Sequence, residues 1–428
     1  MINRSRSART ICCYTFLLTL HLVAVPLSAE ITVTPLEPLV VEALQSNPEI
    51  QAARQELEAA QSGISPAGAL DDPMLEAGVV NLPTTLRFDQ EPMTMRMIGI
   101  GQRLPFPGKR GLRREVAENE AEAVEHLYQE TTNRVIRDVK AAYFDLALVV
   151  KSVGLVEQNK QILEQFLKTA AVQYAVGKGR EADVLKAQIQ VSRMDDELIR
   201  LAREQRLIEA ELSRAMGRTT GLPLPSPEFL RLPEMDLSLD ALREVAVSHR
   251  PQLRARQSMI DRGAKVIELA RKNYYPDFDL RFAYSQRDTL EGGMRQDDVL
   301  SFTVAVNLPF WRQSKLDPQV TEAVAKRTQV LSMYEADLNE INSRLRQELA
   351  NAGQSLKSAR LYETGILPQA KIAVEAALAA YRVNRVDFFT LLDNQMTVFE
   401  YEISQVSAIT SYNKALAEIE FITGSKLF

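Results

Sequence analysis

The feature that most constrains the fold is a proline-free stretch, residues 108–222, which has the pattern of a helix almost throughout. In its second half, apolar residues recur at alternating steps of four and three, and only Gln205 interrupts the series: Met194, Leu198, Leu201, Ile208, Leu212 and Ala215. A period near 3.5 residues is typical of helices that pack along their length, as in a coiled coil. An unbroken helix over residues 109–174 would be about 100 Å long, which exceeds what an ordinary globular domain needs.

A second stretch, residues 319–428, has the same rhythm and contains a single proline, Pro368. Its apolar positions at these steps are Leu331, Tyr334, Leu338, Ile341 and Leu345. In the first stretch we expect the chain to turn back at residues 177–179, because the glycines there free the backbone for a turn. The sequence therefore predicts two long antiparallel helical hairpins.

Residues 1–29 are predicted to be a secretory signal peptide. Arg4, Arg6 and Arg9 form a positive segment, residues 11–25 are apolar, and Ala29 stands at the expected cleavage position. A membrane anchor is the alternative, but the apolar run is short for a span. Loss of three arginines and no acids would change the formal charge from -5 to -8. A mildly acidic mature chain gives no support to nucleic-acid binding.

Both cysteines, Cys12 and Cys13, lie inside this predicted signal. The mature chain would then have no disulfide framework and no cysteine-based metal site. No later run of about 18 apolar residues follows, so insertion into a membrane would have to use β-strands.

Several landmarks recur 203 to 207 residues further along the chain, which indicates an internal duplication. Arg250-Pro251 answers Asn47-Pro48, and Leu308-Pro309-Phe310 answers Leu104-Pro105-Phe106. We predict a first repeat over residues 30–222, a proline-rich linker over 223–236 and a second repeat over 237–428. Each repeat is expected to contain a helix, two strands (within about 74–104 and 278–308) and a long helical hairpin.

Four short segments alternate apolar and polar residues, as half-buried strands do. In residues 300–308, for example, Leu300, Phe302 and Val304 alternate with Ser301 and Thr303. Such strands match a transmembrane β-barrel, although a soluble sheet packed on a helix gives the same alternation. The long helices already pair with one another and leave the strands no apolar partner, which favours the barrel. Four strands are too few to close one, so we predict that the chain oligomerises.

The chain resembles the TolC family of outer-membrane efflux proteins over essentially its whole mature length. The resemblance rests on the duplicated order of elements, the Leu-Pro-Phe turns and the Tyr-Ala-Val-Gly sequence at residues 174–177. The sequences Leu-Pro-Phe-Pro-Gly-Lys-Arg (104–110) and Leu-Pro-Phe-Trp (308–311) are most similar to the branch that serves heavy-metal exporters of the RND type. The resemblance implies a homotrimer in the bacterial outer membrane, in contact with its lipid, with helices that project into the periplasm.

The expected fold class is mainly α with a small β part. Long antiparallel coiled-coil hairpins and four transmembrane β-strands per chain would form two internal repeats of a trimeric α/β barrel. The resemblance implies an exit duct that receives substrate, expected to be heavy-metal cations, from a periplasmic membrane-fusion adaptor and an inner-membrane RND-type pump. A duct for drug efflux or type I secretion is the alternative within this class. A secreted coiled-coil scaffold is the alternative outside it.

The resemblance also places working residues at the two hairpin tips. It assigns adaptor docking to Tyr174, Val176 and Gly177 in the first tip and to Tyr381, Arg382 and Val383 in the second. Each tip is a partial match, because the first lacks the family's arginine and the second has Asn384 where the family has glycine.

Two aspartates follow the tips at positions where the family places carboxylates of its periplasmic entrance. These residues are Asp183 and Asp393. The alternative for either residue is a solvated acid on a helix surface.

Three methionines, Met93, Met95 and Met97, are predicted to share one strand face, opposite Ile98 and Ile100. Thioethers on a lumen wall would contact soft ions such as Cu(I). The plainer interpretation, which we favour, is that these flexible side chains fill space in a narrow barrel.

No motif predicts catalysis. Gly108-Lys109-Arg110 is not a phosphate-binding loop, because six residues rather than four separate Gly101 from Gly108 and no Ser or Thr follows Lys109. Neither His126 nor His249 has a neighbouring histidine at ligand spacing. We therefore expect no enzyme activity, no cofactor and no resident metal.

Overall fold

The computed structural model describes residues 33–218, 224, 226–228, 232–233, 238–383 and 385–427. The predicted signal peptide, most of the predicted linker and Asn384 lie outside these residues. Two-residue strands β1 (Val33–Thr34) and β4 (Ser226–Pro227) pair in parallel, so a described part of the linker region lies beside the beginning of the described chain.

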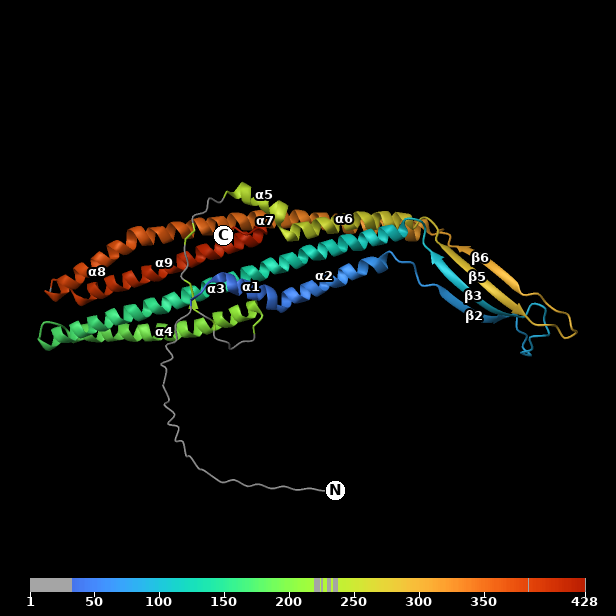
Figure 1. The fold of residues 1–428 in the computed structure, drawn as a ribbon. Helices are drawn as coiled ribbons and strands as arrows, with labels where there is room; N and C mark the ends of the chain where they lie inside the picture. Colours follow the sequence, from blue (N-terminus) through green and yellow to red (C-terminus); the bar gives the residue numbers. More distant parts are fainter. Residues whose placement is uncertain are drawn as a thin grey trace, which may run out of the picture. The chain divides into compact units, whose positions relative to one another are not determined.

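In the first half of the chain, two short helices precede a strand pair and a long helical hairpin (Figure 1). These elements are α1 (Leu36–Ser46), α2 (Pro48–Ala67), β2 (Met74–Val80), β3 (Met95–Leu104), α3 (Lys109–Ala175) and α4 (Glu181–Met216). Helix α3 continues without a break for 67 residues, as the absence of proline predicts. Helix α4 ends at Gly217, whose φ of 74° is the left-handed conformation that commonly terminates a helix.

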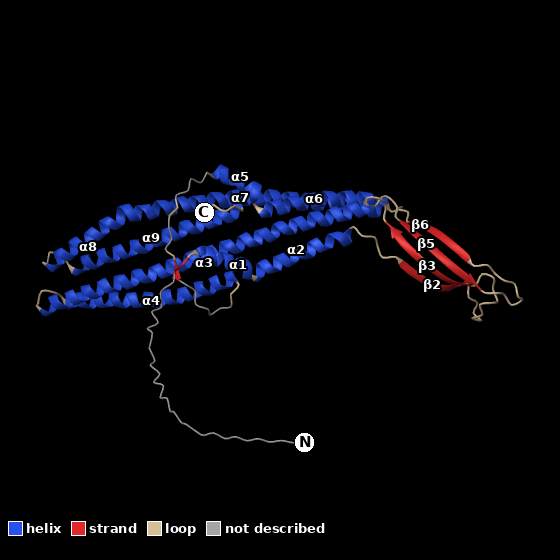
Figure 2. Ribbon diagram, in the orientation of Figure 1, coloured by secondary structure: helices blue, strands red, loops and turns tan. Residues whose placement is uncertain are grey.

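The second half repeats this order. Its elements are α5 (Leu239–His249), α6 (Pro251–Lys272), β5 (Phe278–Arg287), β6 (Val299–Val306), α7 (Asp317–Leu361), α8 (Leu367–Arg382) and α9 (Phe388–Thr423). Figure 2 shows the same alternation of helices and strands in both halves. The recurrence agrees with the predicted duplication, and the residue boundaries of the two repeats stay predictions.

The outgoing helix of the second hairpin differs from α3 because it contains a proline. Pro368 has no N–H to donate, and its ring would clash with the carbonyl four residues earlier in a regular helix. A π-helical turn, η2 (Tyr362–Ile366), precedes it, and the Leu367 N–H donates to the Tyr362 carbonyl five residues back. The helix is therefore interrupted between α7 and α8, whereas α3 is continuous.

Four strands form one antiparallel sheet in the order β2-β3-β5-β6. Each half contributes one strand pair, and β3 pairs with β5 to join the two halves. Strands β2 and β6 are the edges of this sheet. The predicted strands are thus confirmed, and the third and fourth are joined to the first two as one sheet.

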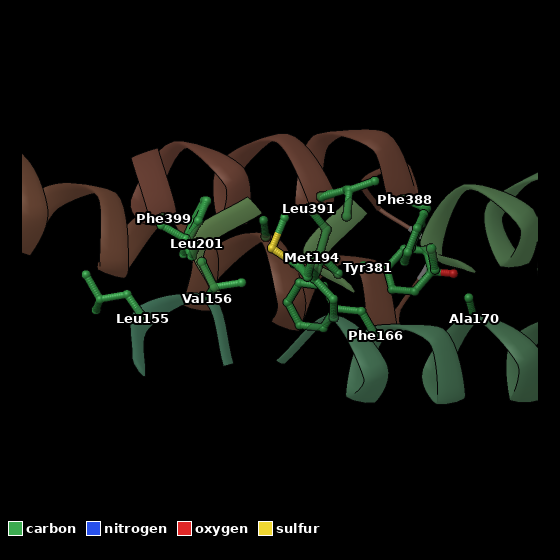
Figure 3. Close-up of a cluster of buried hydrophobic side chains, with 14 of the residues drawn as sticks. Leu155, Val156, Phe166, Ala170, Met194, Leu201, Tyr381, Phe388, Leu391 and Phe399 are labelled. Carbon is green, nitrogen blue, oxygen red and sulfur yellow. The ribbon is translucent and has the colours of Figure 1, made fainter. Parts of the chain in front are cut away.

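The helical core follows the apolar seam that the sequence shows. In α4, Met194, Leu201, Leu212 and Ala215 are all at most 4% exposed, while Leu198 and Ile208 pack partly buried against them. Residues from α3, α4, α8 and α9 make up the cluster drawn in Figure 3, so both hairpins share one core. In α7, Ile341 and Leu345 are buried in a second cluster with α5, α6 and α9.

Candidate functional site

The four-stranded sheet presents one apolar face. Its cross-strand register places Leu75, Ile100, Phe282 and Phe302 in one row across all four strands. Ala77, Ile98, Tyr284 and Leu300 form the next row on the same face. These side chains are largely exposed, with 74% exposure for Leu75 and 69% for Phe302. A contiguous exposed apolar surface of this kind marks an interaction with a membrane or another protein.

The opposite face of the sheet is polar and has small residues at its centre. One row contains Glu76, Gly99, Ala283 and Ser301. Arg281 lies on this face and forms ion pairs with Glu76 and Asp279, each at 3.3 Å. The two faces therefore suit two different environments.

The structure separates the three predicted methionines. Met95 and Met97 belong to β3 and lie on the face opposite Ile98 and Ile100, as expected. Met93 lies before β3, so its assignment to the strand is wrong. The reason is a turn in which the Thr94 N–H donates to the Glu91 carbonyl at 3.0 Å, and this turn delays the start of the strand.

A buried ion pair connects the sheet to helix α3. Lys109, the first residue of α3, donates through Nζ to the Asp277 carboxylate at 2.7 Å, and its side chain is 4% exposed. The Phe106 N–H donates to the same carboxylate oxygen at 2.9 Å. Burial by itself raises the pKa of Asp277, but these hydrogen bonds and the charges of Lys109 and Arg103 outweigh it and lower the pKa. No sequence pattern indicates this pair, because its members are 168 residues apart.

The first hairpin tip connects α3 to α4. The N–H groups of Lys178 and Gly179 both donate to the Gln173 carbonyl at 2.9 Å. Gly177 has a φ of 71°, in the left-handed region that favours glycine, and a Cβ on Gly179 would lie 2.9 Å from the backbone nitrogen of Tyr174. Both glycines are therefore needed for this turn. It leaves the side chains of Tyr174 and Val176 exposed, by 49% and 61%.

The second tip, between α8 and α9, exposes a different set of side chains. Tyr381 is equivalent to Tyr174 but is only 5% exposed. Its ring lies 5.4 Å from that of Phe388, centroid to centroid, inside the cluster drawn in Figure 3. Arg382 is exposed, and Val383 is 64% exposed. The role of Tyr381 at an adaptor contact stays a prediction, and its burial leaves Arg382 and Val383 as the exposed side chains of the predicted set at this tip.

The two tips contact each other through residues that were not among the predicted site residues. Nζ of Lys186 in α4 lies 5.1 Å from the ring centroid of Phe389 in α9, a cation–π distance. Asp387 begins α9, and its carboxylate accepts hydrogen bonds from the Thr390 N–H at 2.9 Å and hydroxyl at 2.6 Å. These bonds, with the charge of Lys186, hold the pKa of Asp387 below its usual value. Aspartate is a preferred residue immediately before a helix, so Asp387 could have been identified from the sequence, whereas the Lys186–Phe389 contact leaves no sequence signal.

The two predicted entrance aspartates lie on these same helices. Asp183 is partly buried in the first turn of α4. Burial of Tyr381 raises the pKa of its hydroxyl, and the negative charge of Asp183 raises that pKa further. Asp393 is exposed on α9. That either carboxylate lines an entrance stays a prediction.

Among the described residues, no group of three or more His, Cys, Asp or Glu side chains is placed to hold a metal ion. Within the same residues, no helix combines the length and the apolar character needed to cross a membrane.

Comparison with known proteins gives consistent matches. A model of the family described as outer membrane efflux protein matches residues 39–218 and 242–425. The chain is 22% identical over 391 residues to the cobalt-zinc-cadmium resistance protein CzcC of Cupriavidus metallidurans, and the match covers 89% of this chain and 87% of CzcC.

Two solved structures have a similar fold. The membrane channel CusC superposes with a TM-score of 0.76 at 15% identity, over 91% of this chain and 92% of CusC. The outer membrane protein VceC of Vibrio cholerae superposes with a TM-score of 0.76 at 17% identity, over 91% of this chain and 96% of VceC. Because the family model matches both halves and most of the length, this chain belongs to the outer membrane efflux protein family.

Proposed function

We propose that the chain is one subunit of a homotrimeric exit duct that carries heavy-metal cations out of the cell. The family supplies the outer-membrane channel of tripartite efflux systems, and its members are transport proteins rather than enzymes. The observation that carries the trimer is the sheet, which has one exposed apolar face, one polar face and two unpaired edges. Three copies joined at these edges would form twelve strands with lipid outside and water inside.

In this proposal the hairpin tips receive a periplasmic membrane-fusion adaptor, which in turn connects the duct to an inner-membrane RND-type pump. Support comes from the exposed side chains of Tyr174 and Val176 at the first tip, and from exposed Val383 next to the exposed cation of Arg382 at the second. An arginine guanidinium pairs well with carboxylates or carbonyls of a partner helix, and the open backbone at Gly177 allows close approach.

The substrate class is supported by the relatives rather than by a binding site. CzcC is named for resistance to cobalt, zinc and cadmium. The Leu-Pro-Phe-Trp sequence at residues 308–311 also resembles the metal-exporting branch. Met95 and Met97 lie on the polar face of the sheet, where we interpret them as flexible side chains that fill space rather than as ligands of the substrate. A duct for drugs or secreted proteins is the second candidate, because the outer membrane efflux protein BepC of Brucella suis, 21% identical over 288 residues, belongs among the relatives without a metal in its name.

The test is growth of a strain that lacks the gene, complemented with variants of this chain. Wild type should restore tolerance to cobalt, zinc, cadmium or copper and leave tolerance to drugs unchanged. Arg382→Glu should fail to restore it although the protein still assembles, whereas Arg206→Glu, an exposed arginine on α4 away from the tips, should succeed. Restored tolerance to drugs alone would overturn the metal substrate, and full function of Arg382→Glu would place the docking surface elsewhere.

A further inference from the structure

The two halves of the chain meet at a corner between the sheet and the helices. Phe106, just after β3, stacks on Tyr275, just before β5, with ring centroids 4.6 Å apart and planes 17° apart. Nζ of Lys272 lies 5.6 Å from the Phe106 ring. The Lys109–Asp277 pair closes the same corner. Residues just after β3 and residues just before β5 therefore hold the two strand pairs together at this corner.

The equivalent corner of the second half is open. Phe310 follows β6 as Phe106 follows β3, and Trp311 comes next. These two rings are 77% and 74% exposed. Two adjacent aromatic side chains so exposed at a sheet edge are a surface that normally has a partner.

The segment that matches Tyr275 in the duplication is also open. Tyr275-Pro276 corresponds to Asp72-Pro73, which precedes β2. This segment is exposed from Ala69 to Leu75 and includes Leu70. Within one chain it cannot reach Phe310, because β2 and β6 are opposite edges of the four-stranded sheet.

We propose that the Phe310–Trp311 corner is a seat for a second copy of this chain, filled by that copy's residues 70–73. The proposal rests on the trimeric duct above and assigns the residues that close it. The proposal follows from the duplication. Inside one chain, the first half contacts the second half at the equivalent corner. Between copies, the second half of one chain would make the equivalent contact with the first half of the next. Residues 70–73 include the acidic Asp71 and Asp72, and the exposed basic residues Arg312 and Lys315 follow Trp311. The charges of the two surfaces are therefore complementary.

The helices beside the two corners discriminate between the contact inside one chain and the proposed contact between two copies. Inside the chain, α3 is held to α6 by ion pairs, Glu120 to Arg262 at 3.1 Å and Glu115 to Lys265 at 2.8 Å. The positions equivalent to Glu120 and Arg262 are Val324 in α7 and Ala59 in α2, both exposed. The positions equivalent to Glu115 and Lys265 are Gln319 and Ser62, which are polar but uncharged. The contact between copies would therefore lack the charges of the contact inside each copy, and a mixed pairing would leave a charge without its partner.

The first test uses Trp311, which is the only tryptophan in the chain. In the detergent-purified trimer its emission should be shifted to the blue, and its quenching by acrylamide should be several-fold weaker than in the denatured chain. Phe310→Ser should raise the concentration at which half of the trimer dissociates by at least about tenfold. Phe389→Ser, which alters a phenylalanine that is 57% exposed at the second tip, should leave that concentration unchanged.

The second test is disulfide trapping. The native cysteines, Cys12 and Cys13, lie in the predicted signal peptide, so the mature chain would carry only the introduced cysteines. Leu70→Cys combined with Trp311→Cys should give covalent dimers and trimers on oxidation. Trp311→Cys combined with Leu86→Cys, an exposed residue in the loop at the other end of the sheet, should not. A trimer in which Trp311 is quenched as in the denatured chain, and in which the first cysteine pair does not cross-link, would overturn the seat but leave the duct standing. Absence of any trimer would overturn both.

Discussion

Asn47 and Arg250 occupy equivalent positions at the starts of α2 and α6, and each holds the end of the last helix of its own half. Asn47 Nδ2 donates to the Ala215 carbonyl at 2.7 Å, and Arg250 Nη1 donates to the Ile422 carbonyl at 3.3 Å. The two acceptors are 207 residues apart, so the duplication has kept the contact while it changed the donor. The pairing closes each half on itself.

Asn47→Ala should lower the free energy of unfolding by about 2 kcal/mol. The Asn47 carboxamide oxygen also accepts from the Glu49 N–H at 2.7 Å and so caps α2, and its removal leaves the Ala215 carbonyl without this donor. Thermal unfolding followed by circular dichroism should show a lower Tm. Ser62→Ala, which removes an exposed hydroxyl on the same helix, is the control and should change stability by less than about 0.5 kcal/mol.

Gly179→Ala should distort the first tip and weaken adaptor binding. The new Cβ would lie within 3.0 Å of backbone atoms of Gln173 and Tyr174, which cannot move without breaking the turn. Gly154→Ala is the matched control, because its Cβ would meet nothing within 4 Å and alanine suits a helix interior. Binding of a purified adaptor to each variant is the measurement. Unchanged binding by Gly179→Ala would mean that the turn plays no part in docking.

Stability should fall in acid because of Asp277. The pKa of Asp277 is lower in the folded protein than in the unfolded chain, where an aspartate titrates at about 3.9. The folded state therefore binds a proton less readily than the unfolded state. The stabilisation is therefore present above that value and is lost as the pH falls through the folded pKa. Denaturant unfolding at a series of pH values from about 5 down to about 2 should show the loss. Asp277→Asn should be less stable at pH 7 and show a smaller dependence, and an equal dependence would argue against this pair.

Asp393→Ala separates two roles for a ring of three carboxylates at the entrance. Such a ring attracts cations and discourages anions, as charged rings do in pores. If the ring is a filter, single-channel recordings should show loss of cation selectivity with little change in conductance. If Asp393 instead holds the entrance closed, conductance should rise sharply. A variant identical to wild type in both quantities would make Asp393 a solvated residue of α9.

Much of the fold is predictable from short-range patterns. The absence of proline over residues 108–222 predicts the continuous helix α3, and the alternation in residues 300–308 predicts β6. Both signals depend only on backbone chemistry and on period, so they survive without knowledge of the partner surfaces. The duplicated landmarks extend these predictions from one half to the other.

What the sequence does not show depends on contacts between distant residues. The ion pair of Lys109 with Asp277 and the contact of Lys186 with Phe389 each join residues from different halves. The duplication even misleads at the tips, since Tyr174 and Tyr381 look alike in the sequence but one is exposed and the other is buried by Phe388. Tertiary packing decides which of two equivalent residues faces the solvent.

The measurement that tests the central claim most directly is the native mass of the intact protein, extracted from the membrane and kept in detergent. The open sheet edges of β2 and β6 require other copies, and four strands per chain are too few to close a barrel. We predict a mass of three chains that persists on dilution. A mass of one chain at every concentration tested would contradict the account.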